Sequence, residues 1–82
     1  MLKKFVNNNL VRFGIRICTL RKTLGISQEE LASRAGIHRT YLGGVERGER
    51  NVGLLNILRI SEALEVRPEE LLKGVQILKK KS

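Results

Sequence analysis

The stretch from residue 27 to residue 42, "SQEELASRAGIHRTYL", restricts the fold more than any other part of the sequence. Ser27 followed three residues later by Glu30 is a capping box, which starts a helix because each side chain can pair with an amide of the first turn. A turn of three residues that begins with Gly36 separates this helix from a second helical stretch over residues 39–47. Two short helices joined by a tight, glycine-containing turn predict a helix-turn-helix.

A longer helix is predicted ahead of this motif, over residues 10–24. Its apolar side chains recur in steps of four, three and four, so that they form one stripe: Phe13, Ile17, Leu20 and Leu24. Asn9 is the expected N-cap, because its side-chain oxygen can accept a hydrogen bond from an amide of the first turn. Gly25 is expected to end the helix.

Two further helices are predicted after the motif. The first covers roughly residues 54–64, and the residues expected on its inner side are Leu54, Ile57, Ser61 and Leu64. Pro68 opens the second, since the first helical position has no need of the amide that proline lacks. We therefore expect an all-α protein, a compact bundle of about five helices that contains the helix-turn-helix.

The length of 82 residues fits a single domain. We expect this domain over residues 10–74, between an N-terminal arm (1–9) and a basic C-terminal tail (75–82). A chain of this size buries only about 60% of its unfolded surface, so its core must be small. A roomy enclosed active site is therefore not expected.

The charge of the chain indicates a polyanionic partner. Sixteen Lys and Arg face eight Glu and no Asp, for a formal charge of +8. Residues 1–50 carry ten basic and four acidic side chains, whereas residues 51–78 carry three basic and four acidic ones. The surface that faces the polyanion is thus expected within the first fifty residues.

The inventory of reactive side chains argues against an enzyme. One His, one Cys, no Asp and scattered glutamates provide no catalytic set, no metal site and no cofactor site. Cys18 is the only cysteine, so no intrachain disulfide can form and a reducing cytoplasm suits the chain. No apolar run approaches the roughly 20 residues of a membrane span, and we expect no membrane partner.

The second helix of the motif has two unlike sides. A helical wheel places Tyr41, Leu42, Val45 and Glu46 on the inner half. The outward half then consists of Arg39, Thr40, Gly43, Gly44 and Arg47. Two adjacent glycines cost about 1 kcal/mol each in a helix interior relative to Ala. Either they leave a bare surface that another molecule can approach closely, or they merely loosen an exposed helix.

The start of this second helix carries side chains suited to DNA bases. A helix in the major groove makes its base contacts near its N-terminus, where Arg39 can pair with guanine and the Thr40 methyl group can touch thymine. His38, one residue earlier, can reach a phosphate or a base, and a solvated turn histidine is the alternative.

The segment "LRKTLGISQEELASRAGIHRTYLGGVERGERN" resembles the DNA-binding domain of Cro and phage-repressor type helix-turn-helix regulators, over roughly residues 13–72. Within that family, "RTYLGGVERGERN" is most similar to restriction-modification controller proteins, which are small homodimers. The resemblance implies that Arg39 and Thr40 read bases. It further implies a set of residues on the sugar-phosphate backbone: Gln28, Tyr41, Arg47, Arg50 and Asn51.

The same resemblance pairs Arg21 with Glu46, and the wheel agrees because it turns Glu46 inward, where a lone carboxylate is costly to desolvate. Three positions depart from the family pattern in ways that weaken capping: Val52, Glu65 and Arg67. Glu65 stands where a glycine usually ends the fourth helix. Gly44 stands where related repressors often carry a base-reading side chain.

The apolar residues after the motif suggest a protein-protein interface. Leu55, Leu58, Leu72 and Val75 are the candidates for a homodimer interface. A dimer would bind a palindromic double-stranded DNA operator. An antitoxin-like interaction module that keeps the helix-turn-helix fold is the alternative function, and contact with a toxin or with RNA polymerase stays open at this stage.

Overall fold

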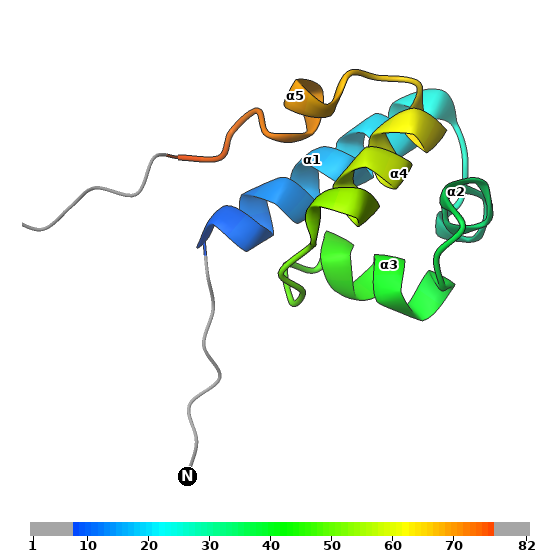
Figure 1. Ribbon diagram of the computed structural model, residues 1–82, viewed down its shortest axis with the longest axis horizontal. Helices are drawn as coiled ribbons and strands as arrows, with labels where there is room; N and C mark the ends of the chain where they lie inside the picture. Colours follow the sequence, from blue (N-terminus) through cyan, green and yellow to red (C-terminus); the bar gives the residue numbers. More distant parts are fainter. Residues whose placement is uncertain (1–7, 77–82) are drawn as a thin grey trace, which may run out of the picture.

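The structure is a computed structural model that describes residues 8–76. Most of the predicted arm and of the basic tail therefore lies outside the described residues. Within residues 8–76 the chain forms five helices and no strand, as Figure 1 shows. These are α1 (Asn8–Leu24), α2 (Gln28–Ala35), α3 (Arg39–Glu46), α4 (Leu54–Leu64) and α5 (Pro68–Leu71). The expected all-α bundle is confirmed.

The N-terminus of α1 differs from the prediction. The helix already includes Asn8, so Asn9 lies inside it and is not the N-cap. The Asn9 side chain instead forms two hydrogen bonds with the main chain of Gln76: its Nδ2 donates to the carbonyl oxygen at 3.0 Å, and its Oδ1 accepts from the amide at 2.8 Å. A tertiary contact thus takes the place of the expected local cap and ties the start of α1 to the segment after α5.

The helix-turn-helix forms as the capping signals predict. The Ser27 hydroxyl accepts a hydrogen bond from the Glu30 amide at 3.0 Å, which satisfies an otherwise unpaired donor of α2. Gly36 ends α2 with a φ of 71°, in the left-handed region that glycine enters without strain. The Ile37 amide then donates to the Ala32 carbonyl, and α3 begins two residues later.

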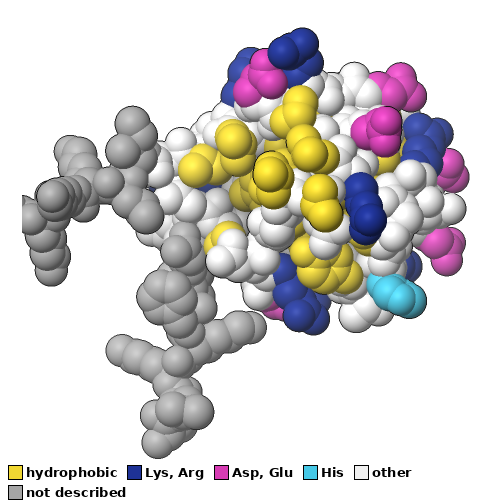
Figure 2. Space-filling view, in the orientation of Figure 1, with side chains coloured by type: hydrophobic (Ala, Val, Ile, Leu, Met, Phe, Trp, Pro, Cys, Tyr) yellow, Lys and Arg dark blue, Asp and Glu magenta, His cyan; other side chains and the backbone are white. Residues whose placement is uncertain are grey.

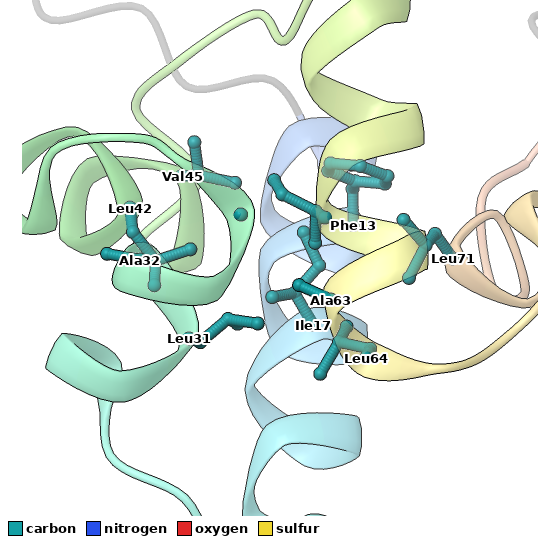
Figure 3. Packing of buried hydrophobic residues seen from close by; sticks show 11 residues of the cluster. Phe13, Ile17, Leu31, Ala32, Leu42, Val45, Ala63, Leu64 and Leu71 are labelled. Carbon is teal, nitrogen blue, oxygen red and sulfur yellow. The ribbon is translucent and has the colours of Figure 1, made fainter.

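The core lies where all five helices meet. Figure 3 shows side chains from every helix pointing toward one another. The fully buried members with the largest side chains are Ile17, Leu31, Leu42, Val45, Ile60, Leu64 and Leu71. Ala32 is buried at the centre of the motif and Ile37 packs against the core from the turn, as the sequence predicts.

Two predicted core residues are exposed. Leu24 is 42% exposed in the last turn of α1, and Leu54 is 69% exposed in the first turn of α4. Neither side chain belongs to the core cluster or packs against it. In α4, Ile60 and Ala63 join Leu64 in the core instead.

Helices α1 and α3 approach each other very closely. A Cβ atom on Gly14 would lie 2.4 Å from the Val45 carbonyl oxygen and 2.5 Å from that of Glu46. Just after α3, Gly48 has a φ of 78°, and a Cβ atom there would lie 2.7 Å from the Cα atom of Val11. Glycine at 14 and 48 therefore allows the C-terminal end of α3 to lie directly on α1.

The segment around α5 lies against α1 and α4. Arg16 of α1 donates from Nε to the Glu70 carbonyl oxygen at 2.8 Å and from Nη2 to its carboxylate at 3.0 Å. Leu71 fills the core beneath these bonds. Among the described residues, no helix is long and apolar enough to cross a membrane.

Candidate nucleic-acid interface

The N-terminal end of α3 presents polar side chains to solvent. His38, Arg39 and Thr40 are all exposed, as expected for residues that would meet DNA. His38 occupies the N-cap position with extended backbone, and its side chain makes no capping hydrogen bond within the described part of the chain. The first turn of α3 and its three leading side chains thus face outward together.

The opposite side of α3 is buried against the rest of the domain. Leu42 and Val45 are fully buried and Tyr41 is half-buried. The Glu46 side chain is only 5% exposed and forms an ion pair with Arg21 of α1, with 2.8 Å between Nε and Oε2. A second bond of 3.1 Å joins Arg21 Nη2 to Glu46 Oε1, so the structure brings the expected pair together in bidentate form.

Gln28 of α2 joins this ion pair. Its Nε2 donates to Glu46 Oε1 at 2.9 Å. Burial alone would raise the pKa of Glu46, but the hydrogen bonds from Arg21 and Gln28, together with the positive charge of Arg21, outweigh burial and hold the pKa below its ordinary value. Glu46 is therefore ionised at neutral pH, and it connects α3 to both α1 and α2.

The position of Gln28 bears on its expected role at a phosphate. One of its amide hydrogens is used by Glu46, and its Oε1 lies 3.7 Å from where a Cβ atom of Gly43 would be. The Gln28 side chain therefore lies beside the middle of α3. Its contact with a phosphate stays a prediction.

The two glycines of α3, for which the sequence leaves open either a bare surface or a loosened exposed helix, are covered in the structure. Gly43 and Gly44 are both buried. A Cβ atom on Gly43 would lie 3.2 Å from Arg47 Nη1, and one on Gly44 would lie 3.2 Å from both Cγ and Nε of Arg50. The wheel places these glycines outward correctly, but arginine side chains from the chain that follows lie over them.

The other expected backbone-binding residues lie after α3. Arg47 is exposed and forms a bidentate pair with Glu49, with Nε and Nη2 donating at 3.1 and 3.2 Å. The Arg50 guanidinium lies over the Tyr41 ring, 5.8 Å from its centroid. Asn51 is exposed at the edge of an apolar groove.

The free positive charge of the domain is concentrated in few residues. Of the eleven Lys and Arg in residues 8–76, six form ion pairs with glutamates. The five without an ion pair in this part of the chain are Arg12, Lys22, Arg39, Arg50 and Arg59. Arg39 is the first residue of α3, and Arg50 comes shortly after its last residue. Positive charge without an ion pair therefore lies near both ends of that helix.

An apolar face forms over α4 and α5, and Figure 2 shows its side chains gathered across the middle of the molecule. The four candidate interface residues are all exposed: Leu55 by 69%, Leu58 by 40%, Leu72 by 49% and Val75 by 36%. Leu54, also 69% exposed, adds to the apolar surface of α4. Leu72 and Val75 also line an open groove of about 160 Å³, together with Phe13, Val52 and Ile57.

Sequence reasoning missed the residues that position Tyr41. The Asn56 amide of α4 donates to the Tyr41 hydroxyl at 3.3 Å, and Arg59 donates to Asn56 Oδ1 at 3.4 Å. These contacts join α3 to α4 and have no local sequence signal. Among the described residues, no group of three or more His, Cys, Asp or Glu is placed to hold a metal ion.

Two short helices, α2 and α3, joined by a tight turn that contains Gly36, with the start of α3 facing outward, define the helix-turn-helix class of DNA-binding domain. The helix-turn-helix family model matches residues 19–71, and the chain belongs to that family. It is 46% identical over 67 residues to the control protein C.BamHI of Bacillus amyloliquefaciens, covering 80% of this chain and 83% of that one.

Two further relatives are also described as control or controller proteins. The chain is 36% identical over 72 residues to the control protein C.MunI of a Mycoplasma species, covering 87% of this chain and 97% of that one. The structure of the restriction-modification controller protein C.AhdI from Aeromonas hydrophila superposes with a TM-score of 0.78 at 52% identity, covering 79% of this chain and 98% of that one. The resemblance to controller proteins is therefore confirmed.

Proposed function

We propose that this protein is a sequence-specific transcription regulator that binds a palindromic double-stranded DNA operator as a homodimer, in the manner of a restriction-modification controller protein. The observation that carries the proposal is the exposed start of α3, where Arg39 and Thr40 face outward on a helix fixed by the Arg21–Glu46 pair. Such a regulator works where the DNA is, which in a prokaryotic cell is the cytoplasm.

In this function Arg39 and Thr40 read bases, and His38 contacts a base or a phosphate beside them. Gln28, Tyr41, Arg47 and Asn51 hold the sugar-phosphate backbone on either side of α3. Arg47 is already paired with Glu49, so a phosphate would compete with that carboxylate for the same donors.

The homodimer rests on the exposed apolar face of α4 and α5. Leu55, Leu58, Leu72 and Val75 would be covered by a second copy, which removes apolar surface from water and places two α3 helices on one side of the duplex. Two half-sites should then lie about 10 bp apart, or a multiple of that. This face is also the surface that an antitoxin-like module would offer to a toxin.

The test compares Arg39→Ala with Gln28→Ala. The operator is first selected by the parent protein from random duplex DNA, and both variants are then measured against its single-base changes at fixed salt. Arg39→Ala should cost about 1 to 3 kcal/mol on the preferred site and relax the preference at one base position of each half-site. Gln28→Ala should weaken binding to all sequences about equally.

The control is a thermal melt of Gln28→Ala, because this change also removes one hydrogen bond from Glu46. If Arg39→Ala weakens every sequence uniformly and leaves the base preferences intact, the base-reading role of Arg39 is wrong. If the parent shows neither sequence preference nor salt-dependent binding, the proposed function itself is wrong and an interaction module is favoured.

A further inference from the structure

The middle of α3 lacks side chains of its own on its outward side. A helix in the major groove presents two or three successive outward positions to the bases. Here the two positions that follow Arg39 and Thr40 on that side are Gly43 and Gly44. Any side-chain contact with the centre of a half-site must therefore come from elsewhere in the chain.

Two arginine side chains cover Gly43 and Gly44 in the structure. Arg50 lies across Gly44, with its Cγ and Nε each 3.2 Å from where a Cβ atom would be and its Cδ at 3.8 Å. Contacts at 3.2 Å are tighter than a Cβ atom ordinarily makes, so a Cβ atom at position 44 would push the Arg50 side chain aside by a few tenths of an ångström. Arg47 lies over Gly43 in the same way, at 3.2 Å from Nη1.

The two arginines differ in how their charge is satisfied. Both Nε and Nη2 of Arg47 donate to the Glu49 carboxylate, so its charge is neutralised next to α3. Arg50 forms no ion pair within residues 8–76 and rests against the face of Tyr41. The Tyr41 ring is held in turn by the Asn56 amide. Arg50 therefore keeps its donors for another acceptor.

We propose that Arg50 is a base-reading residue at the centre of each half-site, and that Gly44 is the positioning residue that lets its side chain lie across α3. This inference rests on the proposed DNA-binding function, and it replaces the backbone role that the family resemblance gives to Arg50. The planar guanidinium can donate two parallel hydrogen bonds to O6 and N7 of a guanine, which selects that base.

The alternative explanation of Gly44 is that a bare position lets the DNA itself come close to the α3 backbone. The two explanations predict different results in a double-mutant cycle. The four proteins are the parent, Gly44→Ala, Arg50→Ala and the double variant. Each is measured against every single-base change of the selected operator at one salt concentration.

Arg50→Ala should reduce discrimination at one base position per half-site by about 5- to 150-fold. Gly44→Ala should reduce discrimination at that same position, because its methyl group displaces the Arg50 side chain. The double variant should then bind like Arg50→Ala alone. If Gly44→Ala weakens binding as much in the Arg50→Ala protein as in the parent, the methyl group clashes with the DNA and the positioning role is overturned.

Arg50→Lys separates base reading from charge. Lysine keeps the positive charge that a phosphate contact needs but lacks the planar pair of donors. We expect Arg50→Lys to lose the same base preference while retaining most of the affinity for random duplex DNA. Retention of the full base preference by Arg50→Lys, or a uniform loss across all sequences in Arg50→Ala, would overturn the base-reading role.

A measurement without DNA checks the geometry. In the parent, the Tyr41 ring current should shift the NMR signals of the Arg50 side-chain protons, and Gly44→Ala should change this shift with no fall in melting temperature. An unchanged shift in Gly44→Ala would contradict the positioning role. Gly53→Ala is the matched control, since no atom lies within 4 Å of a Cβ at that position and its φ of −71° suits alanine. A parent that binds DNA without sequence preference would refute the proposed function, whereas these outcomes refute only the role of Arg50.

Discussion

Glu46 is the residue that fixes the orientation of α3. It accepts hydrogen bonds from Arg21 of α1 and Gln28 of α2, so three helices meet at one carboxylate that is only 5% exposed. The carboxylate lies at the C-terminal end of α3, opposite the end that carries Arg39. A change at Glu46 therefore acts on DNA binding through the tilt of the helix and without touching the DNA.

The Glu46→Ala variant should be markedly less stable. The substitution leaves the Arg21 guanidinium in a site where its side chain is only 11% exposed, and an uncompensated buried charge costs about 3 kcal/mol. Urea unfolding at neutral pH measures the loss. Glu49→Ala is the control, because its pair with Arg47 is exposed and an exposed ion pair contributes little to stability. Equal midpoints for Glu46→Ala and the parent would contradict a structural role.

The same pair should make the fold sensitive to acid. The folded pKa of Glu46 lies below its ordinary value of 4.5, so the stabilisation is present above about pH 4.5 and is lost as the pH falls through the lower folded pKa. The parent should lose stability with falling pH in that window, and Glu46→Gln should show a flatter dependence. Urea midpoints between about pH 6 and pH 2 compare the two slopes, and parallel slopes would exclude Glu46 as the cause.

Residue-level roles differ in how far the sequence predicts them. The Arg21–Glu46 pair is predictable because the helical wheel turns a carboxylate into the core, where it needs a partner. The cover of Gly44 by Arg50 is not predictable, because it depends on the path of the chain after Gly48 has turned it back along α3. A helical wheel describes the sides of a single helix and contains no information about the segment that follows that helix.

At the scale of elements, the end of α4 carries backbone strain. Glu65 is the C-cap of this helix with a φ of 60°, the one positive φ of a residue other than glycine among residues 8–76. A left-handed conformation costs a residue with a Cβ atom about 1 kcal/mol or more. The Glu65 side chain adds little stabilisation that could offset this strain, since it is 74% exposed and lies 4.0 Å from Arg34.

Glu65→Gly should therefore stabilise the protein. We expect a gain of about 0.5 to 1 kcal/mol, because relief of the left-handed strain exceeds the added entropy of the unfolded chain. The matched control is Glu65→Ala, which removes the same charge but keeps the Cβ atom. Alanine should leave the urea midpoint nearly unchanged. An equal gain in both variants would assign the effect to the charge rather than to the backbone.

Helix boundaries were largely predictable, and the burial of helix ends was not. Capping signals are local, so Ser27, Gly36 and Pro68 mark their helices correctly. Burial depends on which neighbours a turn meets, and this is why the apolar stripes wrongly include Leu24 and Leu54. Gly14 shows the same limit: it reads as a weak helix residue, yet it permits the contact between α1 and α3.

At the scale of the whole molecule, the two surfaces of the domain differ in kind. One group consists of Arg39 and Arg50 at the two ends of α3, and the other consists of the exposed leucines of α4 and α5. Figure 2 shows the apolar face as a continuous group of side chains. An exposed group of this kind is typical of an interface.

Leu55→Glu should convert the proposed dimer to a monomer without unfolding it. The side chain is 69% exposed in one copy, so a charge there is tolerated by the fold but would be buried unpaired in the dimer. Sedimentation equilibrium at tens of micromolar measures the change, with circular dichroism to check folding. Ile15→Glu is the control, because Ile15 is 57% exposed on α1 and is not among the interface candidates. Sedimentation of Leu55→Glu as the parent species would place the interface elsewhere.

The pairing of Asn9 with Gln76 has a consequence for protein synthesis. These two residues are 67 positions apart in the sequence. Leu71, a fully buried core residue, lies at the end of α5, just before Gln76. A ribosome releases the N-terminal part of the chain first, so α1, α2 and α3 leave it before the residues of α5 that complete their packing. A chain that terminates before position 71 lacks part of the core, and the domain can close fully only after residue 76 has been made.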